Sequence, residues 1–348
     1  MSAERVLDTQ TLNRTVLARQ LLLARHKITL TRAVEKIGGL QTQYAPSAYI
    51  GLWTRVDGFE RPHLTKALET GRVLQGSLMR VTIHIVSKRD YPFLASAVRL
   101  SRREWWMRVA RARALDPSGH EQVAAILRDA LAHGPRSRTE LIEILDANGF
   151  GKEIWEGAGL WVDLIRMPPS GTWERRRADL YGLAPASEVD ESAGLEYLVR
   201  RYLGGFGPAS IGDIADWGGV PITTLKPVLE RMRLRRFRDA DGGVLVDLPG
   251  QPLPKGDIPA PVRFLPTWDA ILLAHARRAR ILPEEYRSAV FNTKNPHSFT
   301  TFLVDGAVAG IWRHEGGKVT LKPFAPIPRP ARRDLEAEAE RLASFLAD

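Results

Sequence analysis

The stretch GPASIGDI, residues 207–214, is echoed by GPRSRTEL at residues 134–141. In each copy a Gly-Pro turn precedes a serine, Ser210 or Ser137, and an acidic residue follows three positions later. This spacing is a capping box, in which the serine accepts a hydrogen bond at the start of a helix and the acidic side chain returns one. Both stretches therefore predict the start of a short helix.

The residues that follow each copy predict a second helix and then a basic β segment. After residue 214 we expect a helix from Pro221 to Arg231 and a hairpin around Asp241-Gly242-Gly243. After residue 141 we expect an aromatic helix around Trp155 to Trp161, a turn at 168–171 and a basic strand from Thr172 to Tyr181. Two helices followed by a wing are typical of a winged helix-turn-helix.

The N-terminal region predicts the same order. Apolar spacing and turn residues indicate helices over residues 11–25, 31–37, 46–55 and 61–70, followed by a strand over 81–86. We therefore predict an α+β fold with three tandem winged helix-turn-helix units. The expected domains are residues 1–110, 111–188, 189–255 and 256–348.

The last of these domains follows a proline-rich linker, residues 249–261, that should run extended and separate it from the rest. We expect a helix from Asp269 through Arg280 and hairpin turns at 304–306 and 316–317. A closing helix from Pro330 to Leu346 completes a small β-rich C-terminal domain.

The charge balance points to a polyanionic partner. The 348 residues carry a formal net charge of +10 and include no cysteine, which excludes disulfides, cysteine-based zinc sites and iron–sulfur clusters. Nothing resembles a membrane span or a secretory signal, so we expect a cytoplasmic protein that associates with the nucleoid through DNA. The candidate DNA-binding residues are Arg175, Arg176, Arg177, Arg235, Arg236, Arg277 and Arg278.

The candidate catalytic residues are Gln41 and Gln43, which follow Gly38-Gly39 at an expected helix end. Two like-oriented amides could hold one water molecule between them, although an isolated Gln-x-Gln is more often a helix cap or a solvated pair. An amide is a weak base, so such a site suits a bond that is already activated. The N-glycosidic bond to a cationic N7-alkylated purine is such a bond.

Several stretches together resemble the winged-helix family that includes the AlkZ and YcaQ DNA glycosylases. They are residues 39–43 (GLQTQ), 78–86 (LMRVTIHIV), 264–266 (FLP) with Asp269, and 304–306 (VDG). The resemblance extends over nearly the whole chain. YcaQ-like members have aspartate where this chain has Gln43, so the AlkZ-like branch is the nearer one; Thr42 replaces the usual apolar residue between the glutamines.

The resemblance implies a C-shaped protein whose basic concave face holds duplex DNA. A crosslinked or very bulky adduct cannot easily be rotated out of the duplex, so we expect the glutamines to lie exposed on that face. The resemblance implies a DNA glycosylase that acts on N7-alkylated guanine, including bulky natural-product adducts and interstrand crosslinks, in DNA repair or self-resistance. No distinctive lysine signals a Schiff base, so we expect a monofunctional enzyme. His84 lies in a matching stretch and is a secondary site candidate, although a histidine on an apolar strand is more often structural.

The alternative is a non-catalytic winged-helix regulator, because winged helices are most often binding modules. A damage-binding protein without activity is a third reading. No His-Glu-x-x-His spacing or P-loop appears, so we expect neither a metal nor a cofactor. The expected partner is double-stranded DNA with an alkylated purine, bound by a monomer.

Overall fold

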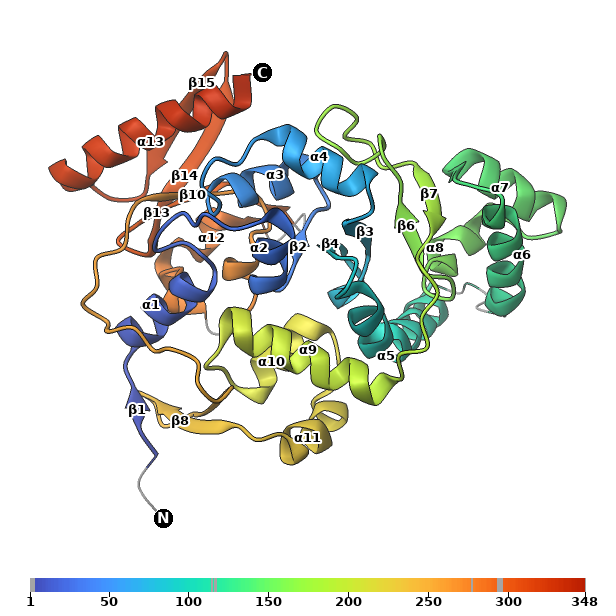
Figure 1. Ribbon diagram of the computed structural model, residues 1–348, viewed down its shortest axis with the longest axis horizontal. Helices are drawn as coiled ribbons and strands as arrows, with labels where there is room; N and C mark the ends of the chain where they lie inside the picture. The colour runs from blue at the N-terminus through green and yellow to red at the C-terminus, as the bar shows by residue number, and fades with distance from the viewer. Residues whose placement is uncertain (1–3, 114, 116–117, 277, 293–296, 348) are drawn as a thin grey trace.

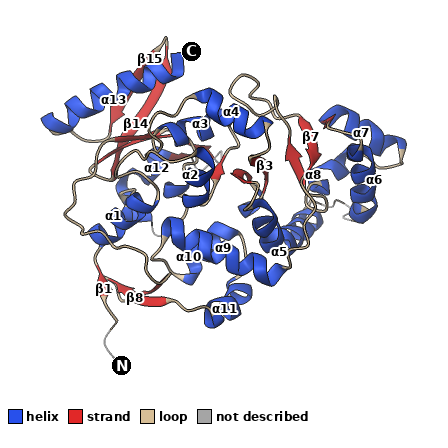
Figure 2. Cartoon of the chain, in the orientation of Figure 1, coloured by secondary structure: helices blue, strands red, loops and turns tan. Residues whose placement is uncertain are grey.

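The computed structural model describes residues 4–113, 115, 118–276, 278–292 and 297–347. Helices and strands are mixed along the chain, which confirms the α+β class, and Figure 2 shows the strands distributed among several sheets. In Figure 1 helix α13 (Arg329–Ala347) lies at one end of the long axis, and helices α6 (His120–Ala132) and α7 (Arg138–Ala147) lie at the other. Within the described ranges no helix has the length and apolar character needed to cross a membrane.

The two echoed stretches form the predicted helix starts. At the start of α7 the backbone N–H of Glu140 donates to Ser137 Oγ over 3.2 Å, and that of Ser137 donates to Glu140 Oε2 over 2.7 Å. At the start of α10 (Ile211–Gly218) the corresponding bonds between Asp213 and Ser210 measure 3.1 Å and 3.0 Å. Both reciprocal bonds are present in each copy, so the capping-box prediction is confirmed.

The elements that follow α10 also match the prediction. Helix α11 spans Ile222–Arg231, and strands β8 (Arg235–Asp239) and β9 (Val244–Asp247) pair antiparallel as a hairpin. Strand β1 (Val6–Leu7) pairs with β8 in parallel. The beginning of the chain is thereby joined to this hairpin, which the sequence did not predict.

The N-terminal helices are close to their expected positions, although the first ends six residues early, at Arg19. They are α1 (Thr9–Arg19), α2 (Leu30–Lys36), α3 (Ala45–Trp53) and α4 (Arg61–Glu69). After α2, Gly38 and Gly39 have φ values of 79° and 89°, which favour glycine. A Cβ on Gly39 would lie 2.8 Å from Val86 Cγ1, so this glycine lets the chain enter the next strand against its neighbour.

That next strand belongs to an antiparallel sheet of six strands in the order β2-β4-β3-β6-β7-β5. Its members are β2 (Leu40–Gln41), β3 (Val73–Ser77), β4 (Ile83–Ser87), β5 (Arg136–Ser137), β6 (Leu164–Arg166) and β7 (Leu180–Leu183). The sheet therefore runs without a break from the N-terminal helices into the region beyond residue 111.

The expected basic strand from Thr172 to Tyr181 is wrong. The chain forms a loop over residues 167–179 and enters β7 only at Leu180. The hydroxyl oxygen of Ser170 accepts hydrogen bonds from the backbone N–H groups of Asp179 and Leu180, over 2.6 Å and 3.1 Å. The N–H of Asp179 is thereby satisfied by a side chain inside the loop, and sheet pairing begins only at Leu180, which lies opposite Ser137. The aromatic helix expected before this loop is likewise reduced to one turn, α8 (Trp155–Ala158).

Two long helices, α5 (Tyr91–Ala112) and α9 (Glu191–Phe206), pack closely at the centre of the fold. A Cβ on Gly194 of α9 would lie 2.8 Å from two backbone atoms of α5, so the contact requires glycine. Buried aromatic side chains of α9 and α10, including Tyr202, Phe206 and Trp217, extend this core toward the second capping box.

The C-terminal region forms an antiparallel sheet in the order β10-β13-β14-β15, covered by α13. Its strands are β10 (Arg263–Leu265), β13 (Thr301–Val304), β14 (Ala307–Glu315) and β15 (Lys318–Pro323). The predicted hairpin turns and closing helix are confirmed, and residues 249–262 lack regular structure as expected. Phe264 and Trp312 nevertheless share a hydrophobic core with Leu40 and Trp53, so this unit packs against the first instead of standing apart.

The expected helix from Asp269 through Arg280 is wrong. This segment contains two short 3-10 turns, Ala270–Leu272 and Arg278–Arg280. The carboxylate of Asp269 accepts hydrogen bonds from the guanidinium of Arg55 over 2.9 Å and 2.8 Å, and both side chains are buried. This long-range ion pair fixes the start of the segment against α3 and outweighs the local tendency to form one helix. Short α12 (Arg287–Val290) and the pair β11 (Phe291–Asn292) and β12 (His297–Ser298) follow.

Candidate functional site

The paired glutamines lie at the end of the six-stranded sheet. Gln41 is the last residue of β2 and lies opposite His84 of β4, while the backbone N–H of Thr42 extends the pairing by donating to Ile83 O over 2.8 Å. The side chain of Gln41 is buried, and that of Gln43 is exposed. The expectation that both glutamines lie exposed is therefore wrong for Gln41, whose amide is held inside the protein at the end of the strand, while that of Gln43 reaches solvent.

The two amides contact each other directly. Gln41 Nε2 donates to Gln43 Oε1 over 2.5 Å, which leaves no space for water between these two atoms. A water molecule bound by the pair would instead lie beside this contact, at the second lone pair of Gln43 Oε1 and the second N–H of Gln41. The two amides act as one polar unit.

Arg80 sets the orientation of this unit. Its Nη2 donates to Gln41 Oε1 over 2.8 Å, and its Nη1 donates to the backbone oxygen of Trp217 in α10 over 2.7 Å. A guanidinium only donates, so Gln41 must present oxygen to Arg80 and nitrogen to Gln43, which in turn presents oxygen. We call this chain of donors, Arg80 to Gln41 to Gln43, the amide relay.

Arg80 lies in a strained turn. It has a φ of 53°, and the β-branched Val81 beside it has a φ of 57°, a region that costs residues other than glycine about 1–3 kcal/mol. A Cβ on Gly219 would lie 3.0 Å from the backbone nitrogen of Arg80, so the turn packs tightly on the end of α10. We did not select Arg80 from the sequence, although it lies in the stretch 78–86 that carries the family resemblance.

His84 lies beside Gln41 in the sheet register and is buried. Burial first, and then the charge of Arg80, lower its pKa to about 3, so the ring is neutral near pH 7. Its Nδ1 lies 3.0 Å from the backbone oxygen of Thr82, a contact in which Nδ1–H donates. His84 therefore carries no positive charge at this site near pH 7.

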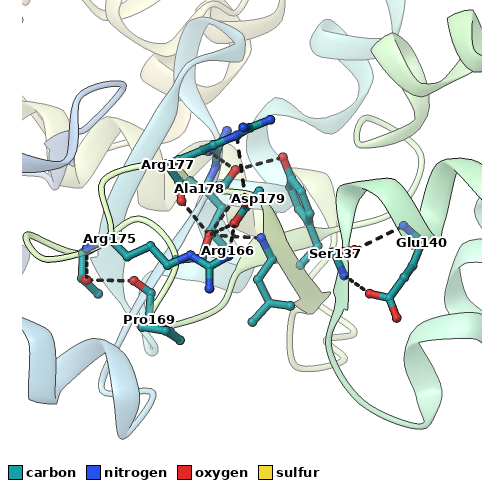
Figure 3. Close-up of polar contacts among 12 residues, drawn as sticks. Ser137, Glu140, Arg166, Pro169, Arg175, Arg177, Ala178 and Asp179 are labelled. Atoms are coloured by element: carbon teal, nitrogen blue, oxygen red, sulfur yellow. Dashed lines mark hydrogen bonds and ion pairs between the residues drawn. The ribbon is translucent and has the colours of Figure 1, made fainter.

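The predicted residues Arg175, Arg176 and Arg177 are exposed on the loop over residues 167–179. Figure 3 shows how polar contacts hold this loop: Arg175 N donates to Thr172 Oγ1 over 3.3 Å, and Arg175 Nη2 donates to Asp179 Oδ1 over 3.1 Å. We call residues 167–179 the arginine loop. Its internal hydrogen bonds give it a defined shape although it contains no strand.

The aromatic and basic side chains of the arginine loop contact the residues that follow Gln43. The ring of Trp173 packs edge-on against Tyr49 of α3, with centroids 5.6 Å apart, and the guanidinium of Arg61 lies 4.7 Å from the Trp173 ring. With the loop anchored in this way, Arg176 Nη1 donates to the hydroxyl of Tyr44 over 3.1 Å. Tyr44 directly follows Gln43, so Arg176 borders the candidate site.

The other predicted arginines are not brought to the glutamines by a described contact. Arg235 of β8 donates to the backbone oxygen of Gln251 over 3.1 Å and lies 4.8 Å from the Phe237 ring, so it is engaged within its own hairpin. Arg236 is exposed on the same strand. Arg277 lies outside the described residues, and of Arg278 only the backbone is described, in a 3-10 turn.

A cavity of about 460 Å³ adjoins the amide relay at Arg80. Arg80 and Val81 line it together with residues of α5 and the start of α11. Trp105 of α5 and Ile222 of α11 are exposed by 40% and 49% at this cavity, and Arg108 adds a cation. Trp105 and Arg108 suit the bases and phosphates of a nucleic acid, although the acidic Glu104 and Asp216 also line the cavity.

The electrostatic character of the site is that of neutral amides beside cations. The side chain of Gln41 accepts a hydrogen bond from Arg80 and donates one to Gln43. Among the residues that the structure describes, no cluster of three or more histidine, aspartate or glutamate side chains is arranged to hold a metal ion. The arrangement can orient a water molecule, and its amides are too weak as bases to remove a proton from it unaided.

Comparisons with known proteins identify what this architecture is similar to. The model of the AlkZ-like family of DNA glycosylases matches residues 34–345. The fold is similar to that of the DNA glycosylase AlkZ from Streptomyces sahachiroi, with a TM-score of 0.82 and 18% sequence identity over 98% of this chain and 97% of that one. No curated protein matches the chain by sequence.

Proposed function

The chain belongs to the AlkZ-like DNA glycosylases, and we propose that it is a monofunctional enzyme that hydrolyses the N-glycosidic bond of N7-alkylated guanine in duplex DNA. The amide relay is the observation that supports this substrate class. It orients two neutral amides, the buried Gln41 and the exposed Gln43, and the group that Gln43 offers to water is an amide. A site with so weak a base suits a leaving group that needs no further activation.

N7-alkylated guanine is such a leaving group. The alkyl group gives the base a formal positive charge, so cleavage of the C1′–N9 bond moves the bonding electrons onto N9 and releases a neutral base. Water then bonds to C1′ and loses a proton to solvent. The enzyme must place that water and stabilise the sugar cation that develops, which positioning and preorganised dipoles can supply.

Each member of the relay has a distinct role in this proposal. Gln43 Oε1 accepts a hydrogen bond from the attacking water and directs its lone pair toward C1′. Gln41 holds Gln43 through their 2.5 Å contact, and Arg80 prevents the Gln41 amide from turning. Arg80 is a positioning residue, because it acts on the reaction through Gln41.

Two features near the relay support DNA as a ligand. The arginine loop supplies exposed cations next to Gln43, and the cavity beyond Arg80 supplies Trp105 and Arg108. The exposed position of Gln43 suits bulky adducts and interstrand crosslinks, which cannot easily be rotated into a closed pocket. We infer a monomer with three winged-helix units around the duplex in a C-shaped arrangement, acting in repair or self-resistance.

Excision from a duplex that carries one N7-methyl-deoxyguanosine tests the proposal. The wild type should produce abasic sites that cleave in alkali, and Gln43→Ala should lower the single-turnover rate by about 10²-fold while duplex binding stays within roughly threefold. A Gln43→Ala protein with the wild-type rate would refute the catalytic role of the pair. A wild type that binds one undamaged sequence tightly and excises nothing would favour the regulator.

A further inference from the structure

Tyr44 presents an exposed aromatic ring immediately after Gln43. Its side chain is 43% exposed, in contrast to that of Tyr49 in the following helix α3, which is buried. Tyr44 precedes α3 as its N-cap residue, and its side chain makes no capping hydrogen bond there. The ring therefore contributes little to the core or to the helix end, and it faces solvent beside the candidate catalytic amide.

This ring already has a cationic neighbour. The guanidinium carbon of Arg176 lies 5.8 Å from the centroid of the Tyr44 ring and 5.7 Å from that of Trp173. The same guanidinium donates to the Tyr44 hydroxyl over 3.1 Å. Trp173 is anchored against Tyr49 and beneath Arg61, so the arginine loop delivers Arg176 to Tyr44 from a distant part of the sequence.

We propose that the Tyr44 ring is a recognition site for the positive charge of the alkylated base, and that Arg176 is the cation it releases when damaged DNA binds. The inference rests on the proposed function, because it assigns a residue that recognises the cationic substrate. N7-alkylguanine and guanidinium are both planar cations with delocalised charge, which aromatic rings attract. The resting contact with Arg176 thus resembles the contact that the substrate would make.

The charges near Tyr44 require that Arg176 leaves the ring when the cationic base binds. Arg61 and Arg176 both lie close to this part of the arginine loop, so a third cation would be repelled while Arg176 stays in place. Arg176 is exposed, and a bound duplex offers it phosphate groups as stronger partners than a tyrosine. A neutral guanine at the same position would gain much less from the vacated ring.

Binding to two duplexes tests the inference without relying on turnover. One duplex carries 2′-fluorinated N7-methyl-deoxyguanosine, whose fluorine slows cleavage of the glycosidic bond, and the other carries 2′-fluorinated deoxyguanosine at the same position. The Kd for the duplex with the neutral base, divided by the Kd for the duplex with the N7-methylated base, measures the preference for the cationic base. Tyr44→Leu should lower this ratio by about 10-fold, within a range of roughly 2 to 30 set by cation–π attraction, whereas Tyr44→Phe keeps the ring and should preserve it.

Substitutions of Arg176 separate recognition of the base from contact with phosphate. Arg176→Ala should weaken binding of both duplexes by a similar factor and leave their ratio equal to or above that of the wild type. Arg175→Ala is the matched control, since Arg175 lies on the same loop but pairs with Asp179. Its ratio should equal that of the wild type.

Two results would overturn the inference. One is a Tyr44→Leu protein that keeps the wild-type ratio, and the other is an Arg176→Ala protein that loses the ratio while Tyr44→Leu keeps it. Excision of N7-methylguanine by the wild type tests the proposed function separately. Intact excision with an unchanged ratio in Tyr44→Leu would count against the recognition site alone. Equal unfolding temperatures of the Tyr44 variants and the wild type provide the check on folding.

Discussion

Arg80→Met tests whether the orientation of Gln41 matters for excision. Methionine retains much of the apolar stem but removes the guanidinium that donates to Gln41 Oε1 over 2.8 Å and to Trp217 O over 2.7 Å. A hydrogen bond that involves a charged group contributes about 1.5–3 kcal/mol. The buried Gln41 amide is then free to turn its nitrogen away from Gln43, and the amide that positions the water is misplaced.

The expected consequence is a fall of about 10²-fold in the single-turnover rate constant for N7-methylguanine excision, which corresponds to about 2.7 kcal/mol in the barrier. Arg80→Lys should fall in between, because one ammonium cannot donate in the forked geometry of a guanidinium. A second readout is the pKa of His84, which the charge of Arg80 lowers in addition to burial. In Arg80→Met the pKa of His84 should rise while it remains below its ordinary value, as measured by NMR of the ring.

A double-mutant cycle decides whether Arg80 acts through Gln41. If it does, Arg80→Met should cost little further rate in a Gln41→Ala background, because the amide that Arg80 orients has already been removed. Losses that simply add would refute the relay and leave Arg80 an independent role, such as contact with phosphate. An Arg80→Met protein with the wild-type rate and the wild-type unfolding temperature would refute the reasoning altogether.

Three further predictions concern the base, the charges and the histidines. Gln43→Glu should keep at least the wild-type excision rate, since a carboxylate accepts the same hydrogen bond from Gln41; a loss as large as that of Gln43→Ala would show that the amide nitrogen is required. The binding constant K for an undamaged duplex falls as salt rises, and replacing Arg175–Arg177 by alanine should make the slope of log K against log salt less steep by up to about 2.7. This corresponds to about 0.9 for each phosphate that the loop no longer neutralises. An unchanged slope would show that the loop does not contact DNA. The pKa of His84 and that of His275 are each lowered to about 3 by burial, so the unfolded state binds protons below pH 6.5 while the native state does not. The free energy of unfolding should therefore fall by about 1 kcal/mol for each of these histidines between pH 7 and 5.5, as measured by urea titration, and His84→Gln should remove about half of that loss.

Local patterns in the sequence predicted the parts of the fold that local interactions determine. Both capping boxes depend on residues three positions apart, and both form as expected. The predictions that were wrong concern segments whose conformation is set by a side chain or by a residue far away in the sequence. Ser170 satisfies the backbone N–H of Asp179, which a basic strand would have used, and the pair of Asp269 with Arg55, 214 positions away, fixes a segment whose composition favours a helix.

The candidate site divides in the same way. Gln41 and Gln43 are two positions apart, so the sequence alone predicts that their side chains lie together, and the structure places them in direct contact. Their role in catalysis remains a prediction. Arg80 is 39 positions from Gln41, and Arg176 is 132 positions from Tyr44. No spacing rule connects residues so far apart in the sequence. Because the chain contains many arginines, the sequence alone does not indicate which of them lie near the glutamines.

The neutrality of the amide pair links the chemistry of the proposed reaction to the openness of its site. A carboxylate that serves as a general base works best when its surroundings exclude water and raise its pKa, which requires a closed pocket. Amides carry no net charge, so Gln43 can remain at the surface without a change in protonation that solvent would influence. In the proposed reaction so weak a base would act only on bonds that alkylation has already activated, and it would not need a closed pocket around it. A lesion too large to enter a pocket would then reach Gln43 while it remains in the duplex, and the hydrogen bonds from Arg80 through Gln41 would supply the fixed orientation that a closed pocket otherwise imposes.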